Sequence, residues 1–140
     1  MLTIEGSKAR QRRLLEVLRR EKLDAIVVAD PKHVYYFSSF ATGWLHQSAF
    51  AITADGGTLL LAANRPAENA AADESLAYEA QWNATLRQEQ PAEVARAMLS
   101  VLKPRGVRKV GLDASSASSQ LALLWEGMAI SIDEHLWQRR

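Results

Sequence analysis

The sequence predicts an α/β domain in which a mixed β-sheet carries helices on both faces. Short β-branched runs alternate with amphipathic helical segments, one pair of strands flanks a glycine turn, and no repeat or linker divides the chain. The 140 residues are close to the commonest size of one domain. A chain of that length buries roughly two thirds of the surface that it exposes when unfolded.

The first three elements follow from local chemistry. A helix is expected from Ser7, as its N-cap, to about Glu21, because its apolar residues lie three or four positions apart: Leu14, Leu15, Val17 and Leu18. Residues 24–29 form a β-branched run with little alternation, which is typical of a strand covered on both faces. Asp30-Pro31 then predicts a helix start, with a short helix over 32–37.

A β-hairpin is predicted next. Residues 48–54 and 58–63 flank Asp55-Gly56-Gly57, and glycine tolerates the positive φ of a tight turn. An alanine-rich helix over 66–75 and a short strand over 78–82 are expected to follow.

The remaining residues continue the alternation. Pro91 opens a helix over 92–102, whose inward residues are Val94, Met98, Val101 and Leu102. Residues 107–113 form a strand, Ser115 or Ser116 caps a helix that ends near 126, and 128–133 form the last strand. Residues 134–140 begin another helix.

Composition excludes several classes of function. Lys and Arg number 17 and Asp and Glu 16, so a net charge of +1 gives no strong field for nucleic acid or anionic membranes. There is no cysteine, which excludes disulfides and thiolate metal sites. No apolar run approaches the ~20 residues of a membrane span, and no secretory signal is visible. A cytoplasmic location is therefore expected.

The polar residues match no common catalytic motif. His33, His46 and His135 lack the spacing of a helical metal site, and zinc usually needs three or four ligands, so no metal ligand is predicted. His33 is expected to be solvated. No G-x-S-x-G, P-loop or G-x-G-x-x-G occurs. Asp30 and Asp113 follow strands where α/β sites often lie, but helix or turn capping explains them more simply.

A basic cluster lies in the first helix: Arg10, Arg12, Arg13, Arg19 and Arg20. Glu16 and Glu21 interleave with these arginines, so pairing four residues apart on a solvated face is the preferred interpretation. A nucleic-acid surface is the weaker one, because no aromatic platform accompanies the charges.

The loop over 40–47 is the candidate functional segment. It places large side chains and a histidine where neither sheet nor helix explains them: Phe40, Trp44, Leu45, His46 and Gln47. Such residues often mark a contact surface. Packing of Trp44 back onto the core is an equal alternative.

These patterns together resemble a known family. L-L-x-x-L-x-x-x-x-L-D-A-I-V-V from Leu14, then D-P-x-H-V-Y-Y-F-S from Asp30, is similar to the opening of creatinase, prolidase and Xaa-Pro aminopeptidases. Tyr36-Phe37-Ser38-Ser39-Phe40 stands where the family typically has Y-L-T-G-F, with Ser39 in the glycine place. The hairpin, V-G-L-D at 110–113 and I-D-E-H-L-W-Q-R-R at 132–140 extend the resemblance over nearly the whole chain.

The resemblance implies a three-layer creatinase/prolidase N-terminal domain with ribonuclease H-like topology over 1–133. Residues 134–140 would begin the linker helix to an absent C-terminal catalytic domain. In the family that domain binds a pair of divalent metal ions (Mn, Co or Zn), whose bridging water attacks the scissile bond. No ligand of that pair is matched here, so we expect no catalytic, cofactor or metal residue in this chain.

The resemblance also implies partners and a role. The expected partners are the catalytic domain of the same chain and a second copy in a homodimer, with no nucleic acid and no membrane. The N-terminal domain would contribute to dimerisation and cover the entrance to a catalytic site, with the loop over 40–47 at that contact. The alternatives are a free-standing small-ligand module with a pocket near Asp30 and Asp113, and an interaction domain that self-associates through Trp44 and Leu45.

Overall fold

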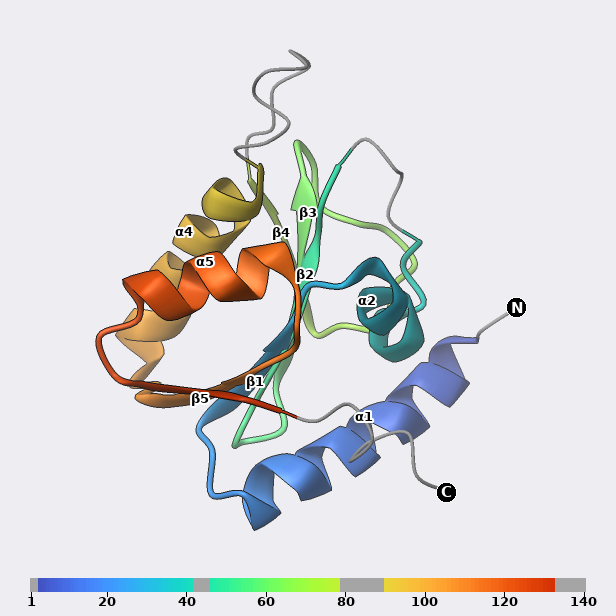
Figure 1. The fold of residues 1–140 in the computed structure, drawn as a ribbon. Coiled ribbons are helices and arrows are strands. Elements are labelled where there is room, and N and C mark those ends of the chain that lie inside the picture. Colours follow the sequence, from blue (N-terminus) through green and yellow to red (C-terminus); the bar gives the residue numbers. More distant parts are fainter. Residues whose placement is uncertain (1–2, 42–45, 79–89, 133–140) are drawn as a thin grey trace.

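A six-stranded sheet between two layers of helices organises the domain (Figure 1). The computed structural model describes residues 3–41, 46–78 and 90–132. The strands are β1 (Ala25–Val28), β2 (Ala49–Thr53), β3 (Thr58–Ala63), β4 (Glu74–Tyr78), β5 (Lys109–Leu112) and β6 (Met128–Ser131). The helices in these ranges are α1 (Ile4–Arg20), α2 (Pro31–Ser38), α4 (Gln90–Leu102) and α5 (Ser116–Leu124), with a 3₁₀ turn at Lys103–Arg105.

The sheet is mixed, as predicted. Its strand order is β4-β3-β2-β1-β5-β6. β2 pairs antiparallel with β1 and β3, while the β1–β5, β3–β4 and β5–β6 pairs are parallel. The carboxyl ends of β1 and β5 therefore meet at one edge of the sheet.

Each face of the sheet is covered by its own pair of helices, which confirms the predicted fold class. Val27 and Leu61 pack with α4 and α5 in one apolar cluster, whereas Ile26 and Phe50 pack with α1 and α2 in the other. Successive side chains of a strand point to opposite faces. The central strand β1 is accordingly buried along its whole length.

Several predicted elements are confirmed within small shifts of their ends. Asp30 caps α2, where its side chain accepts from the backbone N–H of Lys32. The hairpin turns through Gly56 at φ +89°, and α5 is capped by Ser115. In α4 the inward residues Val94, Met98 and Leu102 are buried, but Val101 is only partly so.

The predicted cap of α1 is wrong. Thr3 is the N-cap, and its hydroxyl accepts from the N–H of Gly6 at 3.0 Å. Ser7 lies inside the helix, fully buried, with its hydroxyl 2.6 Å from that of Ser39. An apolar stripe fixes the buried face of a helix but not the turn at which the helix begins, and both hydroxyl residues satisfy the same preference.

The basic cluster of α1 is partly used inside the fold. Arg10 donates to the carbonyl of Tyr36 at 2.5 Å, and its guanidinium lies 4.7 Å from the centre of the Tyr36 ring. Arg13 reaches the hydroxyl of the same tyrosine at 3.4 Å. At least these two arginines join α1 to α2, where we expected pairing with glutamates along one helix.

The alanine-rich helix predicted over 66–75 does not form. Residues 64–73 are an irregular connection between the parallel strands β3 and β4, with Asn64 and Asn69 at positive φ. Its backbone bonds reach distant partners: the N–H of Ala71 donates to Ser38, and its carbonyl accepts from Gln11. These tertiary bonds replace the hydrogen bonds that a helix would have made.

The strand predicted over 78–82 is displaced. β4 occupies Glu74–Tyr78 instead, and residues 79–82 lie outside the described ranges. Asp73 fixes its start, because the Thr58 N–H donates to the Asp73 carboxylate and the Thr58 hydroxyl accepts from the Asp73 N–H. The helix expected from 134 also lies outside the described part of the chain.

Candidate functional site

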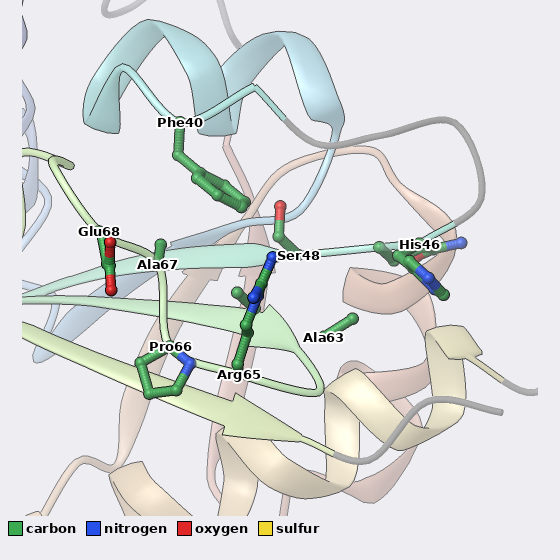
Figure 2. Close-up of a pocket in the computed structure, with 10 residues that line it drawn as sticks. Phe40, His46, Ser48, Ala63, Arg65, Pro66, Ala67 and Glu68 are labelled. Atoms are coloured by element: carbon green, nitrogen blue, oxygen red, sulfur yellow. The ribbon is translucent and has the colours of Figure 1, made fainter.

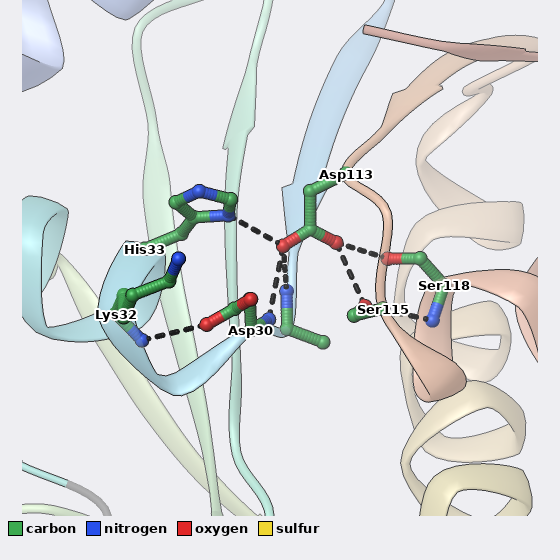
Figure 3. Close-up of polar contacts among 7 residues, drawn as sticks. Asp30, Lys32, His33, Asp113, Ser115 and Ser118 are labelled. Atoms are coloured by element: carbon green, nitrogen blue, oxygen red, sulfur yellow. Dashed lines mark hydrogen bonds and ion pairs between the residues drawn. The ribbon is translucent and has the colours of Figure 1, made fainter. Parts of the chain in front are cut away.

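Asp113 is the centre of a buried polar network at the carboxyl ends of β1 and β5 (Figure 3). Its Oδ2 accepts from the N–H groups of Ala29 at 3.0 Å and Asp30 at 2.9 Å, and lies 2.8 Å from Nδ1 of His33. Its Oδ1 accepts from the hydroxyls of Ser115 at 2.8 Å and Ser118 at 2.6 Å. The carboxylate thus ties β1, α2 and α5 together.

The surroundings of Asp113 favour its ionised form. Burial alone would raise the pKa of this carboxyl, but the bonds from His33, Ser118, the Asp30 N–H and Ser115 outweigh it and hold the pKa below its ordinary value of 3.8. Asp113 is therefore more than a turn cap. It is a buried acceptor whose loss would leave several donors unpaired.

His33 corrects a prediction from the sequence. We expected a solvated side chain, but only 5% of His33 is exposed, because that face of α2 turns toward Asp113. An Asp–His pair can orient an imidazole for proton transfer, yet this one is enclosed in the fold. Within the described ranges no three His, Asp or Glu side chains come together as a metal site would require.

The candidate loop is anchored at both of its ends. Phe40 packs against the apolar cluster of α1 and α2. At the other end, the Gln47 N–H donates to Oε1 of Gln90 at 2.9 Å, and the Gln47 carbonyl accepts from the Tyr78 hydroxyl at 2.6 Å. Burial raises the pKa of Tyr78 to about 12. Trp44 and Leu45 lie outside the described residues, so both interpretations of Trp44 stay predictions.

A pocket of about 360 Å³ lies beside this loop (Figure 2). Three of the five candidate residues line it, namely Phe40, His46 and Gln47. The rest of the lining comes from the ends of β2 and β3 and from the connection after β3: Ser48, Ala62, Ala63, Arg65, Pro66, Ala67 and Glu68. The side chains of Phe40 and Arg65 enter the pocket from opposite sides in Figure 2. The structure thus brings these candidates together in a cavity of the size that small ligands use.

The charged residues of this pocket escaped the sequence analysis. Glu68 falls in the segment 66–75 that we predicted to be helical, and Arg65 lies directly before it; the sequence analysis assigned no role to either residue. The signal that could have found them is the pair of turn formers Asn64 and Asn69, which favour an irregular connection.

Near Asp30 and Asp113, where the small-ligand alternative places a pocket, the two acidic side chains make direct contacts within the protein. Asp30 caps α2, and both oxygens of Asp113 are engaged by protein donors. These two side chains are therefore engaged by the fold, and the small-ligand alternative at this place stays a prediction.

Ser39 explains one detail of the motif in which it lies. It ends α2 in the left-handed conformation, at φ +62°, where glycine carries no steric penalty. The Ser39 hydroxyl donates to the carbonyl of Thr3, and it also contacts the hydroxyl of Ser7. A serine can occupy the glycine place because these contacts from α1 offset the strain.

The fold and these anchors define an α/β domain with a covered mixed sheet. The profile of the creatinase/prolidase N-terminal domain matches residues 10–132. Since this match covers most of the chain, the chain belongs to the creatinase/prolidase N-terminal domain family. Among curated proteins, no sequence matches it.

Solved structures share the fold at low sequence identity. The chain is similar to a proline dipeptidase from Streptococcus agalactiae, with 15% identity, a TM-score of 0.65, and 94% of this chain and 98% of that chain covered. It is similar to the creatinase/prolidase N-terminal domain of an X-Pro dipeptidase from Streptococcus pyogenes, with 12% identity, a TM-score of 0.62, and coverage of 94% and 99%.

A third similar structure shows the domain within a longer chain. The Xaa-Pro dipeptidase from Bacillus anthracis is matched with 11% identity and a TM-score of 0.59 over 91% of this chain but 34% of its own. The same domain therefore makes up about a third of that dipeptidase. Helices long and apolar enough to cross a membrane are absent from the described residues.

Proposed function

We propose that this domain is the non-catalytic N-terminal part of a cytoplasmic creatinase- or Xaa-Pro peptidase-like metallohydrolase, where it contributes to dimerisation and substrate access. The observation that carries the proposal is the family match over 10–132, together with the place of the same fold as about a third of a Xaa-Pro dipeptidase. Its natural partners would be a C-terminal catalytic domain and a second copy of the protein.

The polar groups of the domain support a non-catalytic role. Asp113, the most enclosed carboxylate among the described residues, is saturated by donors from the fold and holds elements together. The divalent metal pair of the parent enzyme would be bound by the catalytic domain. There it would supply the activated water.

Exposed apolar side chains support a contact with another domain or subunit. Leu123 is 81% exposed and Met128 is 57% exposed, at the end of α5 and the start of the edge strand β6. Large apolar side chains that gather on a surface often mark an interface. Substrate access is supported by the anchored loop over 40–47, which borders a pocket.

The test is an assay of the 140-residue chain on Xaa-Pro dipeptides, with Mn²⁺, Co²⁺ or Zn²⁺ added in turn. We expect no turnover, while a full-length Xaa-Pro dipeptidase such as that from Bacillus anthracis, assayed alongside, provides the positive control. Metal-dependent hydrolysis by the pure chain would refute the proposal. Sedimentation of Leu123→Ser and Met128→Ser variants tests the contact surface, and an unchanged dimer would exclude that surface as the dimer contact.

A further inference from the structure

The pocket beside the loop over 40–47 combines two features that bear on what it could bind. One is a pair of opposite charges: among the described residues, the Arg65 guanidinium and the Glu68 carboxylate make no hydrogen bond or ion pair with the protein. The other is an apolar wall formed by Phe40, Pro66 and the alanines of β3. A charged side chain that the fold does not use is available to a ligand.

The space itself is created by small residues. β3 reads Thr-Leu-Leu-Leu-Ala-Ala, and its leucines are buried, whereas the pocket opens beside Ala62 and Ala63 at its end. The volume of about 360 Å³ lies at the lower end of the range of roughly 300–1,000 Å³ that small-ligand pockets span. A dipeptide is small enough for a pocket of that class.

The charges select among ligands of that size. Arg65 offers the planar fork that carboxylates prefer. Glu68 would repel a phosphate or another dianion but would attract an ammonium group. One cation and one anion on the lining therefore suit a neutral zwitterion, and the apolar wall suits an aliphatic side chain between its charged ends.

We propose that this pocket binds a short zwitterionic peptide, with its carboxylate on Arg65, its ammonium group toward Glu68 and an apolar side chain against Phe40. The proposal goes beyond the non-catalytic role given above, because such binding needs neither a metal ion nor a catalytic domain. It assigns to the domain itself a recognition site for peptide ends.

The test is an NMR titration of the 140-residue chain with L-alanyl-L-leucine, its N-acetyl form and its C-terminal amide. The dipeptide should give saturable shifts of amide signals from the residues that line the pocket. Each blocked form should bind about tenfold more weakly, since a charge-assisted hydrogen bond of about 1.4 kcal/mol corresponds to a factor of ten. The Arg65→Gln variant should lose the preference for the dipeptide over its amide.

The Arg12→Gln variant is the matched control, because Arg12 is an exposed arginine of α1 outside the pocket lining. It should bind as the unmodified chain does. The proposal is overturned if no saturation occurs by roughly 10 mM of dipeptide, about ten times the 1 mM Kd of a weak ligand. It is also overturned if the blocked forms bind equally, or if Arg65→Gln keeps the preference for the free carboxylate. The titration involves no hydrolysis, so its failure leaves the proposed function intact, and turnover in the hydrolysis assay would leave the titration intact.

Discussion

Replacement of Asp113 by alanine removes the acceptor on which β1, α2 and α5 converge. The N–H groups of Ala29 and Asp30 lose their partner, and so does Nδ1 of His33. Each buried donor left unsatisfied costs about 1–3 kcal/mol. Two backbone donors alone give roughly 2–6 kcal/mol, since the serine hydroxyls can rotate toward other acceptors. That loss is a large share of the 5–15 kcal/mol that typically stabilise a domain.

Replacement of Asp113 by asparagine separates the charge of this side chain from its shape. The remaining amide oxygen can serve the backbone N–H groups, while the new NH₂ would face Ser115 and Ser118, whose hydroxyls accept as well as donate. Only the charge assistance is lost, so we expect a cost of about 1–2 kcal/mol.

Urea unfolding measured from pH 7 down to pH 3 separates the contribution of the Asp113 charge from that of its hydrogen bonds. The pKa of Asp113 is lowered in the folded state, so its ionised form stabilises the fold fully above the ordinary value of 3.8. That contribution disappears as the pH falls below about 4 and approaches the folded-state pKa. The difference in free energy of unfolding between the unmodified chain and Asp113→Asn should therefore become smaller at acidic pH.

The matched control for Asp113 is Asp30→Asn, at the neighbouring strand end that Asp113 contacts. Asp30 caps α2 through its side chain, and asparagine caps equally well, so its stability should change by less than about 0.5 kcal/mol. The reasoning fails if Asp113→Ala unfolds at the same urea concentration as Asp30→Asn, or if the gap to Asp113→Asn is independent of pH.

Two further variant pairs test backbone conformation and close packing. Ser39→Gly and Ser39→Ala both lose the hydroxyl contacts, but only glycine relieves the strain of φ +62°. Thermal unfolding should therefore show the glycine variant to be more stable than the alanine variant by about 1 kcal/mol. Equal stability of the two variants would contradict a strained cap. At Gly127 an added Cβ would lie 2.1 Å from the carbonyl oxygen of Arg108, so Gly127→Ala should cost more than about 2 kcal/mol. Gly106→Ala adds its Cβ where no atom lies within 4 Å and should cost about 1 kcal/mol for its φ of +77°; an equal loss in the urea midpoints of both variants would refute the steric argument.

The elements that were predicted correctly have their determinants within a few residues. Asp30 and Pro31 start α2 because the capping bond spans two positions, and Gly56 allows the hairpin turn by its own φ. β1 was recognised as a strand covered on both faces because its burial follows directly from its unbroken apolar run. Local chemistry of this kind can be read before any tertiary contact is known.

The errors arise where the partner of a segment is distant in sequence. Alanine has the highest helix propensity, yet residues 66–75 are not helical, because the hydrogen bonds of Ala71 go to Ser38 and Gln11. His33 was expected in solvent because nothing near it in sequence requires burial. Its partner Asp113 is 80 positions away.

The residues of the pocket were predicted only in part, because some of them come from a segment that is distant in sequence from the candidate loop. The loop over 40–47 was recognised by its composition, and Phe40, His46 and Gln47 do line one pocket. Arg65 and Glu68 join that pocket only because β3 runs beside β2 and ends next to the start of that strand. Pairing between strands sets that proximity, and residue type alone does not encode it.

The residues that carry the family resemblance are mostly residues of the scaffold. Asp113, Ser39 and the hairpin turn hold helices and strands in place, so their order along the chain identifies the fold although each motif alone is weak. The same scaffold fixes both ends of the loop over 40–47, through the cap at Ser39 and the bonds at Gln47. Anchored ends allow the intervening sequence to change without cost to the core. We therefore expect the loop and the adjoining pocket to determine what this domain binds, and the motifs that define the family to maintain its fold.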